Sequence, residues 1–235
     1  MYDGLVEDSE KLKYKMNYLA PKVNKIFAKS TTFPTWEKYD YTIPATQNHH
    51  IIFFYAPNCY EFKSTTFCVL FDKKQRFIIR GMSMGYQHIP NGPSIQLPQI
   101  HAYTSHFLQR YNERFLKNPS LSPNEIAGIF LARNEKPMPI KINENINKNY
   151  KEHGIHSDQG FRVKDGFCFT QTTLEGEEDK YGNRENDRVD AMIVIYTTFL
   201  NEYDMSETQR KAINKEHIET IQRSLEVLDF LQHNK

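Results

Sequence analysis

Residues 50–56 read His-Ile-Ile-Phe-Phe-Tyr-Ala, and the five positions from Ile51 to Tyr55 are apolar without interruption. Such a run is typical of a strand that is buried on both faces. Strands are also predicted at residues 65–72 and 76–84, and the residues Asp-Lys-Lys-Gln at 72–75 supply a short hairpin connection between them. Short connections between consecutive strands indicate antiparallel pairing. The sequence therefore predicts a three-stranded antiparallel meander in this region.

Residues 155–172 contain a second hairpin signal. Lys164, Asp165 and Gly166 separate an apolar stretch at 155–163 from another at 167–172, and an Asp-Gly pair in this position is typical of a tight turn. A further buried strand is predicted at 191–199. The segment 174–188 before it is polar and acid-rich, so we interpret it as an exposed loop.

Helices are predicted at both ends of the chain. Near the N-terminus, apolar residues recur at spacings of four and three, which marks one face of a helix: Leu12, Met16, Leu19, Val23 and Ile26. Pro21 predicts a kink, or two short helices that meet at Ala20. Near the C-terminus, Ser206 and Gln209 predict a capping box at the start of a long helix. Its expected apolar face comprises Ile218, Ile221, Leu225 and Leu228.

Two more helices are predicted in the middle of the chain. Thr104 or Ser105 can cap the first of them. Ser122 as N-cap, Pro123 in the first helical position and Glu125 three residues after the cap predict the start of the second. These signals are local, so they locate helix starts independently of the rest of the fold.

The predicted order of elements is α-β-β-β followed by α-α-β-β-β-α, which indicates an α+β fold. We expect an antiparallel sheet with helices packed on one side. Residues 31–48 are interpreted as a connecting loop, and residues 87–99, which contain Pro90, Gly92, Pro93 and Pro98, as a linker. The expected parts are residues 1–90 and 100–235, and the first either extends the sheet of the second or forms a separate lobe.

Composition indicates a folded globular protein, because charged residues make up 25% of the 235 residues and apolar residues 39%. The formal net charge of +1 excludes a general attraction to nucleic acid or membrane, so such binding would need a local patch. No apolar run of 18 residues and no secretory leader pattern is found, so we expect a cytoplasmic protein without a membrane partner. Cys59, Cys68 and Cys168 are interpreted as small buried apolar residues.

Residues 106–114 carry the clearest functional pattern, His-Phe-Leu-Gln-Arg-Tyr-Asn-Glu-Arg. In an α-helix, residues four apart lie about 40° apart around the axis. His106, Arg110 and Arg114 are therefore predicted to share one face, beside an apolar stripe formed by Phe107, Leu108, Tyr111 and Phe115. A proton-transfer group next to two fixed cations suits a phosphate-rich ligand.

This pattern, with the Ser/Pro-capped helix and the Asp-Gly hairpin after it, resembles a bacterial domain family of unknown function related to the BrnT and RelE-type toxin ribonucleases. The matching residues are His106, Arg110 and Arg114, then Glu125-Ile126 in the next helix. The resemblance covers roughly residues 100–200 and leaves the first 90 or so unexplained. This chain is also longer than the family, and the loop at 174–188 has no counterpart.

The resemblance implies a small antiparallel sheet with helices on one side and metal-independent RNA cleavage. His106 would then act as acid or base while Arg110 and Arg114 hold phosphate oxygens. Arg162 and Lys164, at or beside the hairpin turn, are candidates for following the RNA backbone. A second proton-transfer group is needed, and the candidates for it are Tyr196, Tyr111 and His101.

Two alternatives stay open. In the first, the helix is ordinary surface: Arg110 pairs with Glu113 or Glu207, Arg114 with another acid, and the chain is a non-catalytic module whose N- or C-terminal helix binds a partner protein. In the second, His153 and His156 with Asp158 or Asp165 hold a metal. The sequence has no zinc-protease His pair, P-loop, Rossmann glycine set or calcium-loop pattern, so neither metal nor cofactor is expected.

Overall fold

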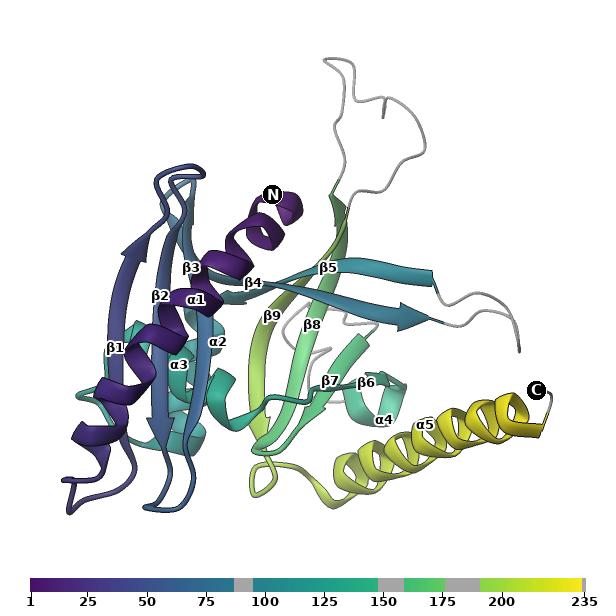
Figure 1. Cartoon of the computed structure of the whole chain (residues 1–235). Helices are drawn as coiled ribbons and strands as arrows, with labels where there is room; N and C mark the ends of the chain where they lie inside the picture. Colours follow the sequence, from purple (N-terminus) through teal and green to yellow (C-terminus); the bar gives the residue numbers. More distant parts are fainter. Residues whose placement is uncertain (87–94, 148–158, 176–190, 234–235) are drawn as a thin grey trace. The chain divides into compact units, whose positions relative to one another are not determined.

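The computed structural model describes residues 1–86, 95–147, 159–175 and 191–233 (Figure 1). It is an α+β structure, as predicted from the sequence. The chain divides into two compact units. Unit 1 comprises Met1–Gly81 and Ala102–Glu135, and unit 2 comprises Met82–His101 and Lys136–Lys235. The metal alternative at His153, His156 and Asp158 and most of the acid-rich loop lie outside the described residues.

Unit 1 contains three helices and a π-helical segment around a sheet whose strands follow the order β1-β2-β3-β4. Its elements are α1 (Tyr2–Phe27), β1 (Thr35–Thr42), β2 (His49–Ala56), β3 (Lys63–Asp72), the first part of β4 (Gln75–Tyr86), α2 (Ser105–Tyr111), η1 (Asn112–Leu116) and α3 (Pro123–Arg133). The pairs β1–β2, β2–β3 and β3–β4 are antiparallel, which confirms the predicted meander. The hairpin at 72–75 is also confirmed: Lys73 and Lys74 both have positive φ, as the favoured two-residue turn requires.

Helices cover both faces of the sheet in unit 1, whereas we expected them on one side (Figure 1). Ile52, Phe54 and Ala56 of β2 pack with α1. The alternate residues face α3: a Cβ on Gly128 would lie only 2.3 Å from the ring of Phe53, and Arg133 donates to the Tyr55 hydroxyl. This two-sided burial is the physical reason for the uninterrupted apolar run in β2.

Three predictions for the first 48 residues need correction. Of the two forms predicted at Pro21, a kink or two short helices, the second is wrong, because α1 is a single helix with Pro21 inside it. Phe27 is buried in place of the predicted Ile26, which is 39% exposed. The predicted loop at 31–48 contains β1. The outer strand β1 was missed because only alternate positions of it pack inward, with Tyr39 and Tyr41 on the α1 side.

Unit 2 contains strands in the order β5-β9-β8-β7-β6. Its elements are β5 (Ile95–Thr104), which crosses into unit 1 at Ala102, then β6 (Met138–Lys141), α4 (Glu144–Asn147), β7 (Gln159–Val163), β8 (Gly166–Glu175), β9 (Ala191–Asn201) and α5 (Glu207–His233). Helices α4 and α5 pack on one face through Ile140, Ile146, Phe167 and Ile213. The predicted linker at 87–99 ends too late, because β5 begins at Ile95 and continues through Pro98.

The predicted hairpin at Lys164, Asp165 and Gly166 joins β7 to β8, and Val163 pairs directly with Gly166. The capping boxes at Ser122 and Ser206 are confirmed as well. We expected α2 and α3 to belong to the second part of the chain, residues 100–235. Both helices belong to unit 1, where α3 packs on β2. Among the described residues, no helix has the length and apolar character that crossing a bilayer demands.

Candidate functional site

Helix α2 carries the His106 pattern and is fixed in place by its apolar side. The Thr104 hydroxyl caps it by accepting a hydrogen bond from the Phe107 amide at 3.0 Å. Phe107 and Tyr111 are fully buried, and each ring lies 5.0 Å from the ring of Phe130 in α3. The predicted apolar stripe is therefore confirmed for Phe107, Leu108 and Tyr111, whereas Phe115 in the following turn is only partly buried. The buried side chains hold the opposite edge of the helix in a defined position.

The geometry of the pattern changes after Tyr111. Residues Asn112–Leu116 form a π-helical turn, which ends at Lys117 in the left-handed conformation. Arg114 lies within this turn. The angle of 40° around the helix axis between residues four apart holds for an α-helix. It therefore describes His106 and Arg110, but it does not describe Arg114 in the π-helical turn.

The three predicted residues have different surroundings. His106 is exposed and forms no hydrogen bond or ion pair within the part of the chain that the structure describes. The Arg110 side chain is 42% exposed, and its guanidinium lies 2.9 Å from a carboxylate oxygen of Glu113. Arg114 is partly buried. The hydrogen bond from Gln109 and the charges of Arg110 and Arg114 hold the pKa of Glu113 below its ordinary value.

This carboxylate is one of the two partners that the structural alternative assigns to Arg110. The other, Glu207, pairs instead with Lys211 at 2.7 Å. Glu113 and Arg110 are both exposed, so their pair is weak and exchanges readily with solvent ions. The arginines of α2 and η1 therefore have a local counterion that a phosphate ligand would have to displace.

The candidates for a second proton-transfer group are all buried. Tyr111 stacks on Phe115 within unit 1. His101 and Tyr196 belong to unit 2, where His101 Nδ1 lies 2.9 Å from the Tyr196 hydroxyl and Nε2 lies 3.0 Å from Gln99 Oε1. These three residues are buried, whereas His106, the first predicted proton-transfer group, is exposed.

Arg162 and Lys164 form a separate set, since they belong to unit 2 and α2 belongs to unit 1. The Arg162 guanidinium pairs with the Glu202 carboxylate. Lys164 is exposed on the hairpin turn. The structure thus leaves Lys164 accessible and gives Arg162 a structural partner.

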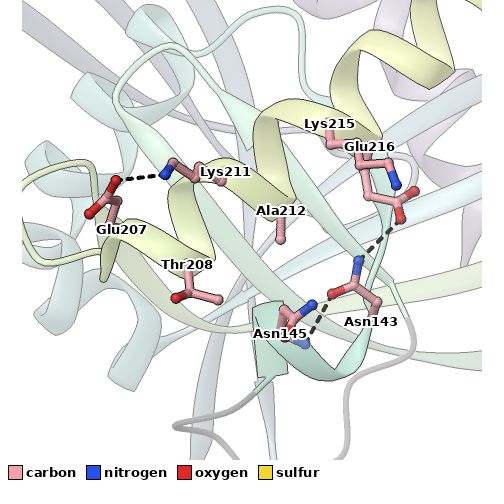
Figure 2. Close-up of a pocket in the computed structure, with 8 residues that line it drawn as sticks. All are labelled: Asn143, Asn145, Glu207, Thr208, Lys211, Ala212, Lys215 and Glu216. Carbon is pink, nitrogen blue, oxygen red and sulfur yellow. Dashed lines mark hydrogen bonds and ion pairs between the residues drawn. The ribbon is translucent and has the colours of Figure 1, made fainter.

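A groove of about 430 Å³ lies between α4 and α5 (Figure 2). Its charged groups are satisfied locally: Lys211 pairs with Glu207, and Asn143 donates to Glu216 at 3.1 Å. The Asn143 side chain also accepts a hydrogen bond from the backbone amide of Asn145, in the first turn of α4. These contacts join the two helices, and His106, Arg110 and Arg114 do not line this groove.

One buried polar cluster was missed by the sequence analysis. Asp8 of α1 is fully buried and accepts hydrogen bonds from Thr46, Asn48 and His50 at 2.8–2.9 Å. Burial raises the pKa of Asp8, but the hydrogen bonds from Asn48, His50 and Thr46 outweigh it and hold the pKa below its ordinary value. The signal was present in the sequence, because Asp8 lies at helical spacing between Leu5 and Leu12 on the apolar face.

Comparison of the chain with protein-family models, with characterised proteins and with solved structures finds no match. The resemblance to the BrnT and RelE-type ribonucleases thus rests on the residues of α2, η1 and α3 and on the order of elements in the sequence. Within the described residues, no group of three or more His, Cys, Asp and Glu side chains is arranged to hold a metal ion.

Proposed function

We propose that the exposed edge of α2 and η1 binds RNA phosphates and that His106 transfers a proton in metal-independent cleavage. The observation that carries the proposal is the combination of an exposed His106 and a half-exposed Arg110 on a helix whose opposite side is fixed in the core. Because the helix is already fixed, its charged groups do not have to become ordered when RNA binds. The entropic cost of association is therefore lower.

The chemistry needs only groups that this edge supplies or that RNA brings. A ribose 2′-hydroxyl attacks the neighbouring phosphorus, the bond to the 5′ oxygen breaks, and a 2′,3′-cyclic phosphate forms. An imidazole can accept the hydroxyl proton or donate one to the leaving oxygen at neutral pH. Guanidinium groups bind the phosphate oxygens and stabilise the extra negative charge of the transition state.

Glu113 gives the proposal a specific competitor. Its carboxylate neutralises part of the charge that a phosphate would meet, and it is 44% exposed. RNA binding at this edge therefore requires the Arg110 guanidinium to exchange one anionic partner for another. A carboxylate in this place would tune affinity without preventing binding.

Binding to a partner protein is the second candidate function, and an observation in α5 favours it. Ile218 is 54% exposed and Ile221 36% exposed on the face that we expected to be apolar. The side chains of Leu225 and Leu228 lie outside the described residues. Exposed apolar side chains on one helical face are typical of a docking helix.

Removal of the competing carboxylate is expected to strengthen RNA binding. Glu113→Gln should lower the Kd for a labelled single-stranded RNA by about two- to fivefold, because an exposed pair of this kind is worth little. Arg110→Ala should weaken binding and reduce the slope of log Kd against log salt by about 0.7, the value for one lost phosphate contact. Fluorescence anisotropy at several salt concentrations measures both quantities.

Glu7→Gln is the matched control for this experiment. It makes the same charge change in an exposed pair, that of Glu7 with Lys11 on α1. If Glu7→Gln and Glu113→Gln change the Kd equally, the effect is one of net charge and the α2 edge is not the binding surface.

A further inference from the structure

Lysine and tyrosine side chains gather on one side of α1, at its border with β1. Residues 11–36 contain six lysines and no acidic residue. Neighbours on the surface of a helix are three and four residues apart. That spacing connects five residues along one side of α1: Tyr14, Lys15, Tyr18, Lys22 and Lys25. We call these residues, together with Tyr39 and Tyr41 of β1, the α1–β1 surface.

Cation–π contacts hold the lysines of this surface against tyrosine rings. The Lys15 ammonium lies 5.4 Å from the ring centroid of Tyr18 and 5.5 Å from that of Tyr41. The Lys22 ammonium lies 5.9 Å from the ring centroid of Tyr39. These contacts restrict two long side chains that would otherwise move freely in solvent. The surface therefore presents positive charges at defined places beside flat rings.

The α1–β1 surface is open to solvent. Tyr14 is 76% exposed and Tyr18 71% exposed, and Lys22 and Lys25 are exposed as well. Lys15, Lys22 and Lys25 form no ion pair within the part of the chain that the structure describes. The surface is thus a local positive patch of the kind that a chain with a net charge of +1 needs for binding a polyanion.

Two carboxylates mark the borders of the surface. Glu7 pairs with Lys11 at 3.7 Å and lies about 12 Å before Lys15 along the helix axis. This exceeds the Debye length of about 8 Å at physiological salt, so the pair of Glu7 and Lys11 lies outside the surface. Glu37 is the one carboxylate that β1 contributes on the side of Tyr39. Burial and the charge of Glu37 raise the pKa of Tyr39, so the Tyr39 hydroxyl stays protonated at neutral pH.

We propose that the α1–β1 surface binds single-stranded nucleic acid, with its lysines on phosphates and the rings of Tyr14 and Tyr18 stacked on bases. Lysines without acidic partners attract the phosphate backbone. Exposed rings between the lysines stack on unpaired bases of any sequence, whereas a duplex keeps its bases stacked on one another. The inference does not rest on the RNA cleavage proposed for α2, because α1 lies on the opposite face of the sheet in unit 1 (Figure 1).

A membrane surface fits α1 less well. A helix that lies on a membrane inserts an apolar face between the lipids. The apolar face of α1 is already packed on β2 through Leu12, Leu19, Val23 and Phe27. Between residues 11 and 29, Ile26 is the one large aliphatic side chain that is exposed. The exposed side of the helix thus offers lysines and tyrosines, which suit phosphates and bases.

Photocrosslinking locates the bound bases directly. The full chain is irradiated with an oligomer of thymidine and 5-iododeoxyuridine about 15 nucleotides long, within the site sizes of roughly 4–16 nucleotides found for single strands. Peptide mass spectrometry identifies the crosslinked residues. Because DNA has no 2′-hydroxyl, the reaction proposed for His106 cannot consume this probe. We expect crosslinks to Tyr14 and Tyr18. The matched controls are Tyr60 and Tyr203, which are 93% and 94% exposed and should crosslink less.

Substitutions separate stacking from charge, and fluorescence anisotropy measures the Kd for the same oligonucleotide. Tyr18→Ala should raise the Kd by about fivefold or more through the loss of base stacking, whereas Tyr18→Phe should leave it unchanged. Lys22→Gln should reduce the slope of log Kd against log salt by about 0.7. Lys13→Gln is its control, because Lys13 is exposed on the same helix but about 180° away around the axis. It should leave the slope unchanged.

Circular dichroism verifies that each variant is folded. Crosslinks that follow exposure alone, or equal slopes for Lys22→Gln and Lys13→Gln, would overturn the proposal. Polyglutamate that displaces the oligonucleotide as well as thymidine oligomers do would overturn it in favour of an acidic protein partner. Binding to vesicles of phosphatidylserine and phosphatidylcholine, without binding to the oligonucleotide, would overturn it in favour of a membrane surface.

Discussion

Asp8→Ala is expected to lower the free energy of unfolding by about 3–5 kcal/mol, the usual cost of removing one member of a buried charged pair. The Asp8 carboxylate is the shared acceptor for Thr46, Asn48 and His50. Its loss leaves these donors without a partner in a buried site and separates α1 from the turn at 43–49. Urea denaturation at pH 7, followed by circular dichroism, measures the effect.

Asp3→Ala is the matched control, since Asp3 is exposed in the first turn of the same helix. Its replacement should change stability by less than about 1 kcal/mol. Equal effects of the two substitutions would contradict a buried, satisfied role for Asp8.

The contribution of Asp8 also depends on pH, and the sign follows from its lowered pKa. A group whose pKa is lower in the folded than in the unfolded chain stabilises the fold fully above its ordinary value, here 3.8. That stabilisation is lost as the pH falls through the lowered value. The stability difference between wild type and Asp8→Asn should therefore be constant near neutral pH and shrink below about pH 4.

Gly166→Ala is the second substitution with a large expected effect, a loss of about 3 kcal/mol or more. Gly166 ends the β7–β8 turn with φ of +154°, and a Cβ there would lie 2.3 Å from the carbonyl oxygen of Leu200 and 2.8 Å from Phe199 Cζ. The carbonyl belongs to the backbone of β9 and cannot move aside without breaking the ladder. Strain and overpacking each cost about 1–3 kcal/mol.

Gly4→Ala serves as the control with the opposite sign. Gly4 lies in α1, and the nearest atom to an added Cβ is 3.7 Å away, an ordinary contact. Alanine there should stabilise the helix by about 0.5–1 kcal/mol. Thermal unfolding measures the stability of both variants. Equal stability of Gly166→Ala and Gly4→Ala would contradict the predicted clash at Gly166.

Local signals predicted a large part of this fold. The Lys-Lys and Asp-Gly hairpins and the capping boxes at Ser122 and Ser206 depend on neighbouring residues, and each is confirmed. The strands of the meander were also predicted, and in β2 the unbroken apolar run follows from burial on both faces. Strand β1 was missed since its pattern is mixed, and β5 because Pro98 was interpreted as a loop residue.

Long-range contacts could not be predicted from the sequence. The packing of α3 on β2 joins residues about 75 positions apart, and no pattern in either segment indicates the other. The π-helical turn at 112–116 likewise has no sequence signal that we recognised. The pair of Asp8 and His50 spans 42 positions. The position of Asp8 on an apolar helix face was the one sequence feature that indicated a buried partner.

The candidate site was predicted in part. The sequence predicted a helix with a buried aromatic stripe beside His106, and the structure confirms it. Glu113 was named as a partner of Arg110 in the structural alternative, and the ion pair is present. RNA binding at this edge requires Arg110 to exchange the Glu113 carboxylate for a phosphate. No sequence pattern encodes how readily this exchange occurs.

Cleavage of a labelled mixed-sequence RNA in the presence of EDTA tests the proposed function most directly. The wild-type chain is compared with His106→Ala and Arg110→Ala, each verified as folded by circular dichroism. We expect products with 2′,3′-cyclic phosphate ends from the wild type, and a loss of cleavage of at least about 100-fold in His106→Ala. Absence of cleavage by the wild type, or equal cleavage by His106→Ala, would contradict the assignment of His106 as the proton-transfer group.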